Sequence, residues 1–300
     1  MTLGNTPRVA FIGFGEAGQA IAAGLREDGI ERIAAWDILF AQREGEKLRA
    51  AGQTMGVRLA SSAADAVRDA DLVIAAVTAA SSLEAARSAA PHLSNRPYYL
   101  DINSVSPGRK QATARLLGGA ARYVDVAVVA AIHPARHRTP ILTAGPHAQA
   151  IAPLLAELGM TAIVAGPEIG AAAAIKMIRS VMIKGIEALT FECFVAAGRA
   201  GILDEVTASL NNNYPGLDWA RMTQYNLERM ASHGERRAAE MEESAATLRE
   251  LGLDPLMVEA TVSRQREMGA IGRQDSVRAT LTQGREAIVD AVSAAAKERK

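Results

Sequence analysis

Residues 8–26 read RVAFIGFGEAGQAIAAGLR, and this stretch decides the expected fold. A short apolar run, Val9–Ile12, comes first; the glycine-rich segment 13–18 and then apolar residues at helical spacing follow. The pattern predicts a strand, a tight turn and a helix. Glycine suits such a turn because the chain must bend sharply and its backbone must come close to a bound pyrophosphate. The helix N-terminus then offers free N–H groups to that anion.

An acidic residue follows the turn at the distance typical of dinucleotide-binding folds. Residues 31–37, ERIAAWD, predict a second strand that ends in Asp37, where a carboxylate binds the adenosine ribose. A surface aspartate that starts the next helix is the simpler alternative, and Asp37 can do both. We expect NAD, with NADP as the alternative, because a carboxylate repels a 2′-phosphate and the nearest arginine is Arg43. The predicted cofactor-binding residues are Gly13, Phe14, Gly15, Glu16, Ala17, Gly18, Asp37, Val77, Thr78 and Asn103.

Composition excludes several classes of protein. The 300 residues include 33 basic and 33 acidic side chains, so bulk electrostatics does not favour a nucleic-acid partner. The single cysteine, Cys193, excludes an internal disulfide and a cysteine zinc site, and no metal site is expected. Its helical surroundings, with Phe191 and Phe194, predict a buried core thiol. We expect no membrane partner and a cytoplasmic protein, since neither a signal sequence nor an apolar run of bilayer length is present.

The rest of the chain divides into two halves. Further strands are expected in alternation with helices, at residues 57–59, 71–78, 97–102, 123–132, 140–143 and 162–164. This rhythm predicts an α/β Rossmann-type doubly wound parallel sheet. Later residues have only helical patterns, which predict helices over 170–200, 203–210, 219–233, 234–251, 255–268 and 279–300. We therefore expect an NAD(P)-binding Rossmann domain at 1–165 and an all-α substrate and dimerisation domain at 166–300.

Three segments carry side chains suited to chemistry. Thr78 follows a buried strand, and residues 101–107, DINSVSP, follow another; parallel strands present such residues to the ligand crevice at their carboxyl ends. Asn103 and Ser104 could therefore hold a substrate carboxylate or hydroxyl, whereas the simpler alternative for these serines and for Thr78 is helix capping. Substrate binding is predicted for Asn103, Ser104, Arg179 and Ser180.

The third segment is the start of the long helix, where Lys176, Arg179 and Ser180 share one face. A lysine among apolar residues usually packs its stem and keeps its tip in water. Here the helix begins where the sheet ends, so its first turns are expected to face the crevice. Burial and the neighbouring Arg179 would lower the pKa of Lys176, which suits it to pass a proton near neutral pH.

These segments, in this order, resemble the β-hydroxyacid dehydrogenases, a family that includes 3-hydroxyisobutyrate and 6-phosphogluconate dehydrogenases. The family's glycine-rich turn matches residues 13–18, its substrate motif matches 101–107, and its Gly-x-x-Gly and lysine motif matches Gly166, Gly170 and Lys176. The helical half resembles a C-terminal domain of poorly characterised members. The resemblance implies that Lys176 is the general acid/base and that the protein is a homodimer through the helical half.

The chain departs from the family pattern at two places. The asparagine four residues after the lysine is Ser180 here, and an Asp-Ala-Pro-Val-Ser-Gly-Gly-like substrate segment reads DVAVVAA at 125–131. The usual small 3-hydroxy acid or 6-phosphogluconate is therefore not assured as substrate. A cationic segment follows this stretch, and it could hold an anionic group or be a solvated loop. A second cationic pair lies near the position where relatives of the family have a lysine–aspartate pair close to the cofactor. The residues concerned are His133, Arg136, His137 and Arg138, and then Arg236 and Arg237.

The function predicted from these observations is hydride transfer between a nicotinamide cofactor and a secondary alcohol or hydroxy acid, with Lys176 as general acid/base. The substrate is expected to be a small, anionic molecule. One alternative is an imine reductase, whose known relatives often replace the lysine with another proton donor. The other is a non-catalytic dinucleotide-binding or sensor protein, which the altered 125–131 segment favours.

Overall fold

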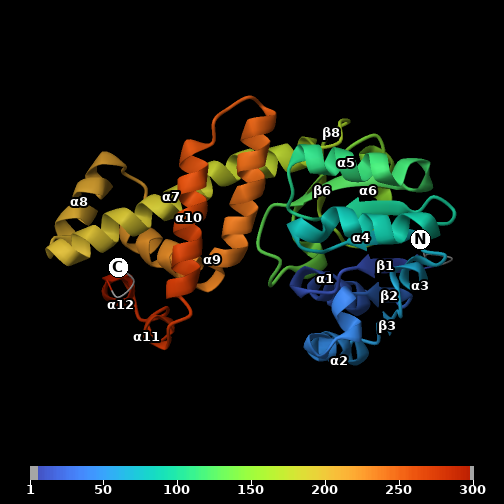
Figure 1. Cartoon of the computed structure of the whole chain (residues 1–300), viewed down its shortest axis with the longest axis horizontal. Coiled ribbons are helices and arrows are strands. Elements are labelled where there is room, and N and C mark those ends of the chain that lie inside the picture. Colours follow the sequence, from blue (N-terminus) through green and yellow to red (C-terminus); the bar gives the residue numbers. More distant parts are fainter. Residues whose placement is uncertain (1–5, 298–300) are drawn as a thin grey trace. The chain divides into compact units, whose positions relative to one another are not determined.

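The computed structural model describes residues 6–297, and the part up to Lys176 forms one compact unit around an eight-stranded sheet (Figure 1). The strand order is β3-β2-β1-β4-β5-β6-β7-β8, and all neighbouring pairs are parallel except β6 and β7. The predicted Rossmann-type, mostly parallel sheet is thus confirmed. The strands are β1 (Val9–Ile12), β2 (Ile33–Trp36), β3 (Arg58–Leu59), β4 (Leu72–Ala75), β5 (Tyr98–Asp101), β6 (Arg122–Val128), β7 (Ile141–Ala144) and β8 (Ala162–Gly166).

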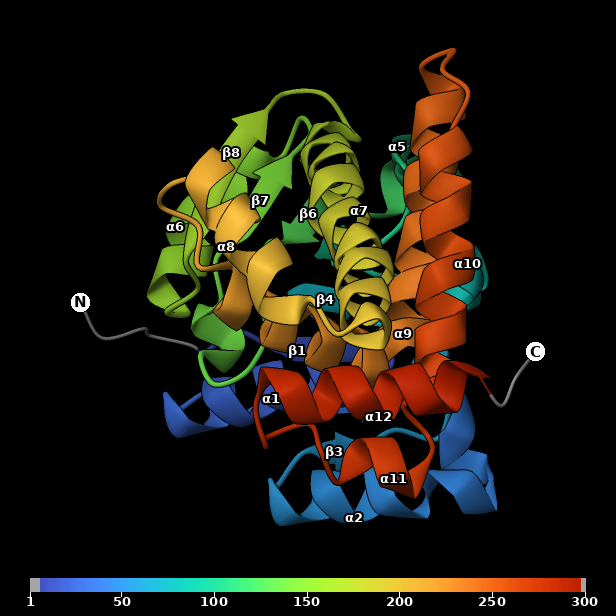
Figure 2. The same ribbon diagram turned by 90° about the vertical axis from the view of Figure 1, so that its left-hand side faces the viewer.

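Helices cover both faces of this sheet, which explains why its central strands are apolar at successive positions. Phe11, Ile74 and Leu100 point to the face that α1 and α6 cover, whereas their neighbours Val73 and Tyr99 point to the face of α3, α4 and α5. Figure 2 shows β6, β7 and β8 side by side at one end of the sheet. The helices are α1 (Glu16–Glu27), α2 (Glu46–Thr54), α3 (Ala63–Val67), α4 (Ser82–Ala89), α5 (Pro107–Leu117) and α6 (Ala148–Glu157).

The second compact unit begins at Met177, inside the long helix α7 (Ala171–Ala200), and the described part of it is all-helical. The loss of strands after residue 165, from which the domain boundary was predicted, coincides with the end of β8 at Gly166. No described helix is long and apolar enough to cross a membrane. The remaining helices are α8 (Leu203–Asn213), α9 (Trp219–Glu250), α10 (Leu256–Ile271), α11 (Asp275–Arg278) and α12 (Arg285–Lys297).

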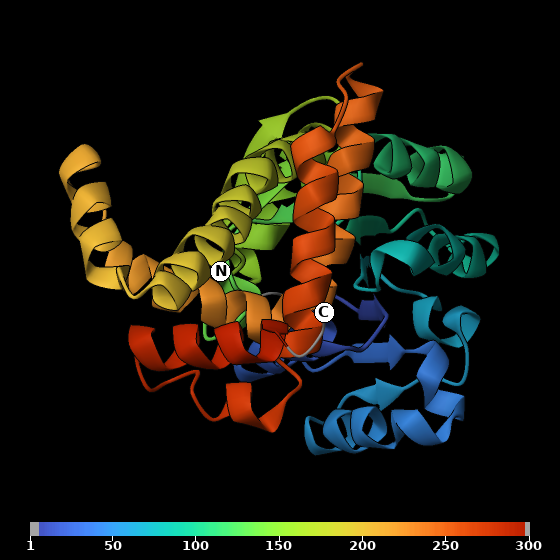
Figure 3. The same ribbon diagram turned by 60° about the vertical axis from the view of Figure 1, so that its left-hand side comes forward.

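The prediction of two helices at 219–233 and 234–251 is wrong, because α9 runs unbroken through Gly234. This glycine lies where α9 and α10 pack side by side (Figure 3). A Cβ at Gly234 would come within 2.2 Å of the Gln265 carbonyl oxygen, and one at Gly269 on α10 would come within 2.8 Å of the Glu235 backbone nitrogen. Glycine therefore allows the close approach of two helices here and does not end one.

Two further sequence predictions in the helical half need correction. The helix predicted over 279–300 starts later than expected: α11 ends at Arg278, a turn follows, and α12 begins only at Arg285; residues 298–300 lie outside the described residues. Cys193 is exposed, not buried. Phe191, Phe194 and Val195 share the buried face of α7, and the helical rotation of about 100° per residue turns Cys193 away from it.

We predict that Gly234→Ala lowers the free energy of unfolding by roughly 1–3 kcal/mol, because the new methyl group forces α9 and α10 apart. Thermal or denaturant unfolding monitored by circular dichroism measures this change. The matched control is Ser232→Ala on the exposed side of the same helix, which should be neutral or slightly stabilising. Equal unfolding midpoints for the two variants would contradict the close contact.

Candidate active site

The glycine-rich turn after β1 has the shape that a pyrophosphate requires. Gly13 has φ +93°, and a Cβ there would lie 2.4 Å from the Ala76 carbonyl oxygen; a Cβ at Gly18 would lie 2.7 Å from the Gly13 carbonyl oxygen. A Cβ at Gly15, in contrast, would meet nothing within 4 Å. Two glycines are thus needed for packing, and the third leaves open space at the N-terminus of α1.

That open space lies beside the first backbone N–H groups of α1. Gly15 is the N-cap residue without a side-chain cap, and the Gln19 N–H is the first that bonds back to it. The N–H groups of Glu16, Ala17 and Gly18 precede it and have no acceptor within the helix. Phe14 is fully buried, its N–H donates to Asp37 and its carbonyl oxygen accepts from Gln19 Nε2, so it supports the turn from within. These residues fit a dinucleotide's pyrophosphate.

Asp37 lies next to this turn and has two structural bonds. Its Oδ2 accepts a hydrogen bond from the Phe14 N–H at 2.7 Å, and its Oδ1 accepts one from the Leu39 N–H at 2.9 Å. Asp37 therefore starts the following 3-10 turn, as the simpler prediction had it, and also fixes the glycine-rich turn. Each carboxylate oxygen keeps a lone pair that can accept a ribose hydroxyl.

The ends of β4 and β5 are joined by the Asn103 side chain, which is buried. Its Oδ1 accepts the Val77 N–H at 2.7 Å, and its Nδ2 donates to Asp101 Oδ1 at 2.8 Å. Asn103 thus fixes the two loops at this edge of the sheet. Thr78 is the residue after Val77, and its hydroxyl donates a hydrogen bond to the Ser81 hydroxyl at 3.1 Å.

Lys176 and Ser104 come together in the sheet unit, although 72 residues separate them. The Lys176 Nζ donates a hydrogen bond to Ser104 Oγ at 2.5 Å, and both side chains are only partly exposed. Lys176 lies in the first two turns of α7, and Ser104 lies just after β5. An amine and a hydroxyl that are hydrogen-bonded in this way can pass a proton to or from a polar group of a bound molecule.

Arg179 and Ser180 belong to the helical unit. Arg179 is exposed, whereas Ser180 is buried and its hydroxyl accepts a hydrogen bond from Lys184 Nζ at 3.2 Å. Lys184 also forms an ion pair with Glu240 at 2.8 Å. Burial lowers the pKa of Lys184; Glu240 opposes this effect, and Arg237 and Arg236 add to it. Sequence reasoning missed Lys184, whose signal was its position one turn after Ser180.

The cationic segment after β6 is paired with acids of α1. Arg136 forms an ion pair with Glu27, and His137 and Arg138 both contact Asp28, at 2.8 and 2.7 Å. Partial burial disfavours the charged form of Asp28, but hydrogen bonds from His137 and Arg138 outweigh it and lower the pKa of that carboxyl. These side chains therefore stabilise the loop against α1, and His137 is buried there, which differs from the solvated loop of the simpler alternative. Arg237 likewise forms a buried ion pair with Glu187.

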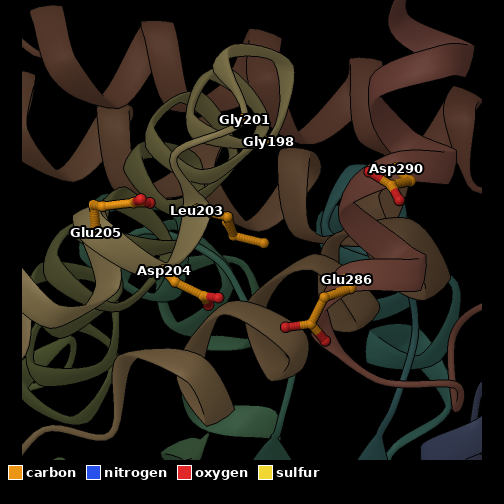
Figure 4. Close-up of a pocket in the computed structure, with 7 residues that line it drawn as sticks. All are labelled: Gly198, Gly201, Leu203, Asp204, Glu205, Glu286 and Asp290. Atoms are coloured by element: carbon orange, nitrogen blue, oxygen red, sulfur yellow. The ribbon is translucent and has the colours of Figure 1, made fainter.

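The helical unit also contains a pocket. Four of its seven lining residues are acidic: Asp204, Glu205, Glu286 and Asp290 (Figure 4). Arg285, whose side chain pairs with Asp204 and Glu286, offsets part of this charge. The pocket contains none of the sequence-predicted site residues, and its charge would repel an anionic substrate.

Comparison with known protein families gives two matches. Residues 8–104 match the family described as NADP oxidoreductase coenzyme F420-dependent. Residues 197–268 match a domain of unknown function, DUF1932. The first match covers the glycine-rich turn, Asp37 and Ser104, and the second lies within the helical half. The family matches thus agree with an N-terminal NAD(P)-binding domain and a helical C-terminal domain.

Solved structures extend this likeness to the whole chain. A conserved hypothetical protein from Sinorhizobium meliloti 1021 is 36% identical, with 97% of each chain covered and a TM-score of 0.78. Conserved protein MTH1747, whose structure is described as similar to 3-hydroxyacid dehydrogenases, is 32% identical over 88% of this chain and 97% of its own, with a TM-score of 0.70. The 3-hydroxyisobutyrate dehydrogenase of Mycobacterium tuberculosis shares the fold at 16% identity, with 99% and 100% of the chains covered and a TM-score of 0.73.

The chain therefore has the 3-hydroxyacid dehydrogenase-like fold, with an NAD(P)-binding domain followed by a DUF1932 helical domain. Within that class, it belongs to the family of conserved protein MTH1747 and the Sinorhizobium meliloti protein. The resemblance to β-hydroxyacid dehydrogenases drawn from the sequence is confirmed.

Proposed function

We propose that this protein is an NAD(P)-dependent oxidoreductase that transfers a hydride between the nicotinamide and a secondary alcohol or hydroxy acid. The observation that carries the proposal is the 2.5 Å hydrogen bond between Lys176 Nζ and Ser104 Oγ. It supports a proton-transfer pair at the edge of the sheet where Asn103 and Asp37 hold the loops of a dinucleotide site.

A nicotinamide dinucleotide would be held by the glycine-rich turn and Asp37, and it would supply the hydride chemistry at the carbinol carbon. Lys176, as the neutral amine, takes the hydroxyl proton during oxidation and gives it back, as the ammonium, during reduction. The Ser104 hydroxyl accepts from Nζ and holds the substrate oxygen within reach of it. We assign substrate orientation to Ser104, with Arg179 and Ser180 as the further substrate-binding residues predicted from the sequence.

The substrate class follows from what surrounds the strand ends. Residues 129–131, which come directly after β6, are Val-Ala-Ala, where the dehydrogenase pattern has a serine and two glycines. The cationic side chains of the next loop are paired with Glu27 and Asp28. Residues 129–131 would then contact an apolar part of the substrate.

We expect Lys176→Met to lower kcat by at least about a hundredfold and to leave the cofactor Kd unchanged, because the substitution removes the proton carrier and keeps the side-chain volume. Hydroxy acids and secondary alcohols, with both NAD and NADP, are screened by the absorbance of the reduced nicotinamide. The matched control is Lys297→Met on the exposed side of α12.

Three results would decide against this proposal. If Lys176→Met keeps full turnover, Lys176 is not the acid/base. If imines are reduced and no alcohol is oxidised, the protein is an imine reductase. If the cofactor binds and neither kind of substrate reacts, it is a dinucleotide-binding protein.

We propose NAD as the preferred cofactor, because the Asp37 carboxylate repels a 2′-phosphate. Fluorescence titration should give a Kd for NADH at least about tenfold lower than that for NADPH. Asp37→Asn should reduce the difference, since the amide can still accept from the Phe14 N–H but carries no charge. Glu84→Gln, at an exposed acid of α4, is the control. Tighter binding of NADPH by the unaltered protein would show that the inference from Asp37 is wrong.

We also propose a homodimer through the helical half. The supporting observation is an exposed apolar stripe on α7, formed by Ile178, Met182 and Leu189. Met182→Glu should convert a protein with the mass of two chains into one with the mass of a single chain, measured by light scattering. Ser263→Glu, on the exposed side of α10, should leave the mass unchanged. A single-chain mass for the unaltered protein would contradict the dimer.

A further inference from the structure

A buried lysine of α5 lies between the strand ends that hold Ser104 and the helix that holds Lys176. Lys110 has no exposed surface, and its Nζ forms ion pairs with Asp101 Oδ1 at 3.2 Å and with Asp125 Oδ1 at 3.5 Å. It also donates to the backbone carbonyl oxygens of Asp101 and Val126. All three charged side chains are therefore fully buried in the sheet unit.

The two carboxylates need this cation. Asp101 on β5 and Asp125 on β6 are register partners in adjacent parallel strands, so two negative charges are buried side by side. Buried charges are costly unless they are paired and hydrogen-bonded. Lys110 compensates one of the two charges, and the N-terminus of α7, with its partial positive charge, faces the other.

Asp101 controls the Ser104 side of the site. Its Oδ1 accepts hydrogen bonds from the Asn103 N–H at 3.1 Å and from Asn103 Nδ2 at 2.8 Å, and its Oδ2 accepts one from the Tyr123 hydroxyl at 2.9 Å. Asn103 is the residue directly before Ser104. The position of the Ser104 hydroxyl thus depends on the orientation of the Asp101 carboxylate.

Asp125 controls the Lys176 side. Its Oδ2 accepts from the Gly170 N–H at 3.1 Å and from the Ala173 N–H at 3.2 Å, which fixes the first turn of α7 three residues before Lys176. Among the described residues, its Oδ1 has no hydrogen-bond partner and only Lys110 Nζ as an ion-pair partner. Without Lys110, this buried oxygen would face no charged partner, and one of the two contacts that orient the carboxylate would be lost.

We infer that Lys110 is a positioning residue: through Asp101 and Asp125, it sets the distance between the Ser104 hydroxyl and the Lys176 amine. Lys110 acts through these carboxylates, since it is buried behind them in α5 and touches neither Ser104 nor Lys176 in any described contact. The consequence for turnover rests on the proposed function. The consequence for the first turn of α7 does not.

The test is Lys110→Met, which keeps the length of the side chain and removes its charge. We expect kcat to fall at least about tenfold, with the substrate KM and the cofactor Kd within about threefold of the unaltered values, because binding groups stay and the proton-transfer geometry is lost. The control is Arg26→Met, which removes a cation bonded to the carbonyl oxygens of Met55 and Glu31 in the same unit.

A second measurement separates positioning from general stability. Amide hydrogen exchange by NMR should show the Gly170 and Ala173 N–H groups exchanging at least about tenfold faster in Lys110→Met, with the β1 amides unchanged. Arg26→Met should leave Gly170 and Ala173 as they are. If Lys110→Met does not fold, Lys110→Gln replaces it: it removes the charge and keeps a polar end, and we expect the same two amides to exchange faster.

The inference is overturned if exchange rises uniformly across the sheet, or if kcat falls no more than in Arg26→Met. If the unaltered protein turns over no substrate, the proposed function fails by itself, and the exchange of the Gly170 and Ala173 amides still decides the role of Lys110.

Discussion

The first turn of α7 is held by a single buried carboxylate, and the candidate site depends on that bond. Asp125 on β6 accepts hydrogen bonds from the N–H groups of Gly170, directly before α7, and of Ala173 in its first turn, so the start of the helix that carries Lys176 is fixed against β6. Helix N-termini favour negative charge, and burial strengthens the interaction because water does not screen it. This arrangement places a second buried carboxylate beside that of Asp101, and Lys110 compensates one of the two negative charges.

The two parts of the candidate site depend on contacts of different range in the sequence. The turn after β1 and Asp37 provide an open N-terminus and an acceptor for a dinucleotide, and they need only local contacts to do so. The proton-transfer pair needs residues from β5 and α7 that are far apart in the chain. The dinucleotide site is therefore a property of one strand–turn–helix unit, whereas the chemistry is a property of the whole sheet unit.

Sequence patterns predicted best where one element alone sets the geometry. The glycine-rich turn, the mostly parallel Rossmann-type sheet and the long helix predicted over 170–200 all follow from local spacing, and the structure has them. Predictions from sequence patterns were wrong where the packing of one helix against its surroundings sets the role of a residue. The sequence predicts separate helices at 219–233 and 234–251, but α9 continues through Gly234, where the contact with α10 requires a glycine. Cys193 was expected in a core, but the rotation of α7 faces it outward.

The amino-acid sequence by itself determined the nucleotide-binding fold and the candidate lysine, because hydrophobic periodicity and glycine spacing act over a few residues. Only the tertiary structure decided the partners of the charged side chains. Arg136, His137 and Arg138 pair with acids about 110 residues earlier in the chain, and Lys110 joins two strands. A charged side chain interacts with the groups that folding brings within a few ångströms of it, and the spacing of residues along the sequence does not give those distances.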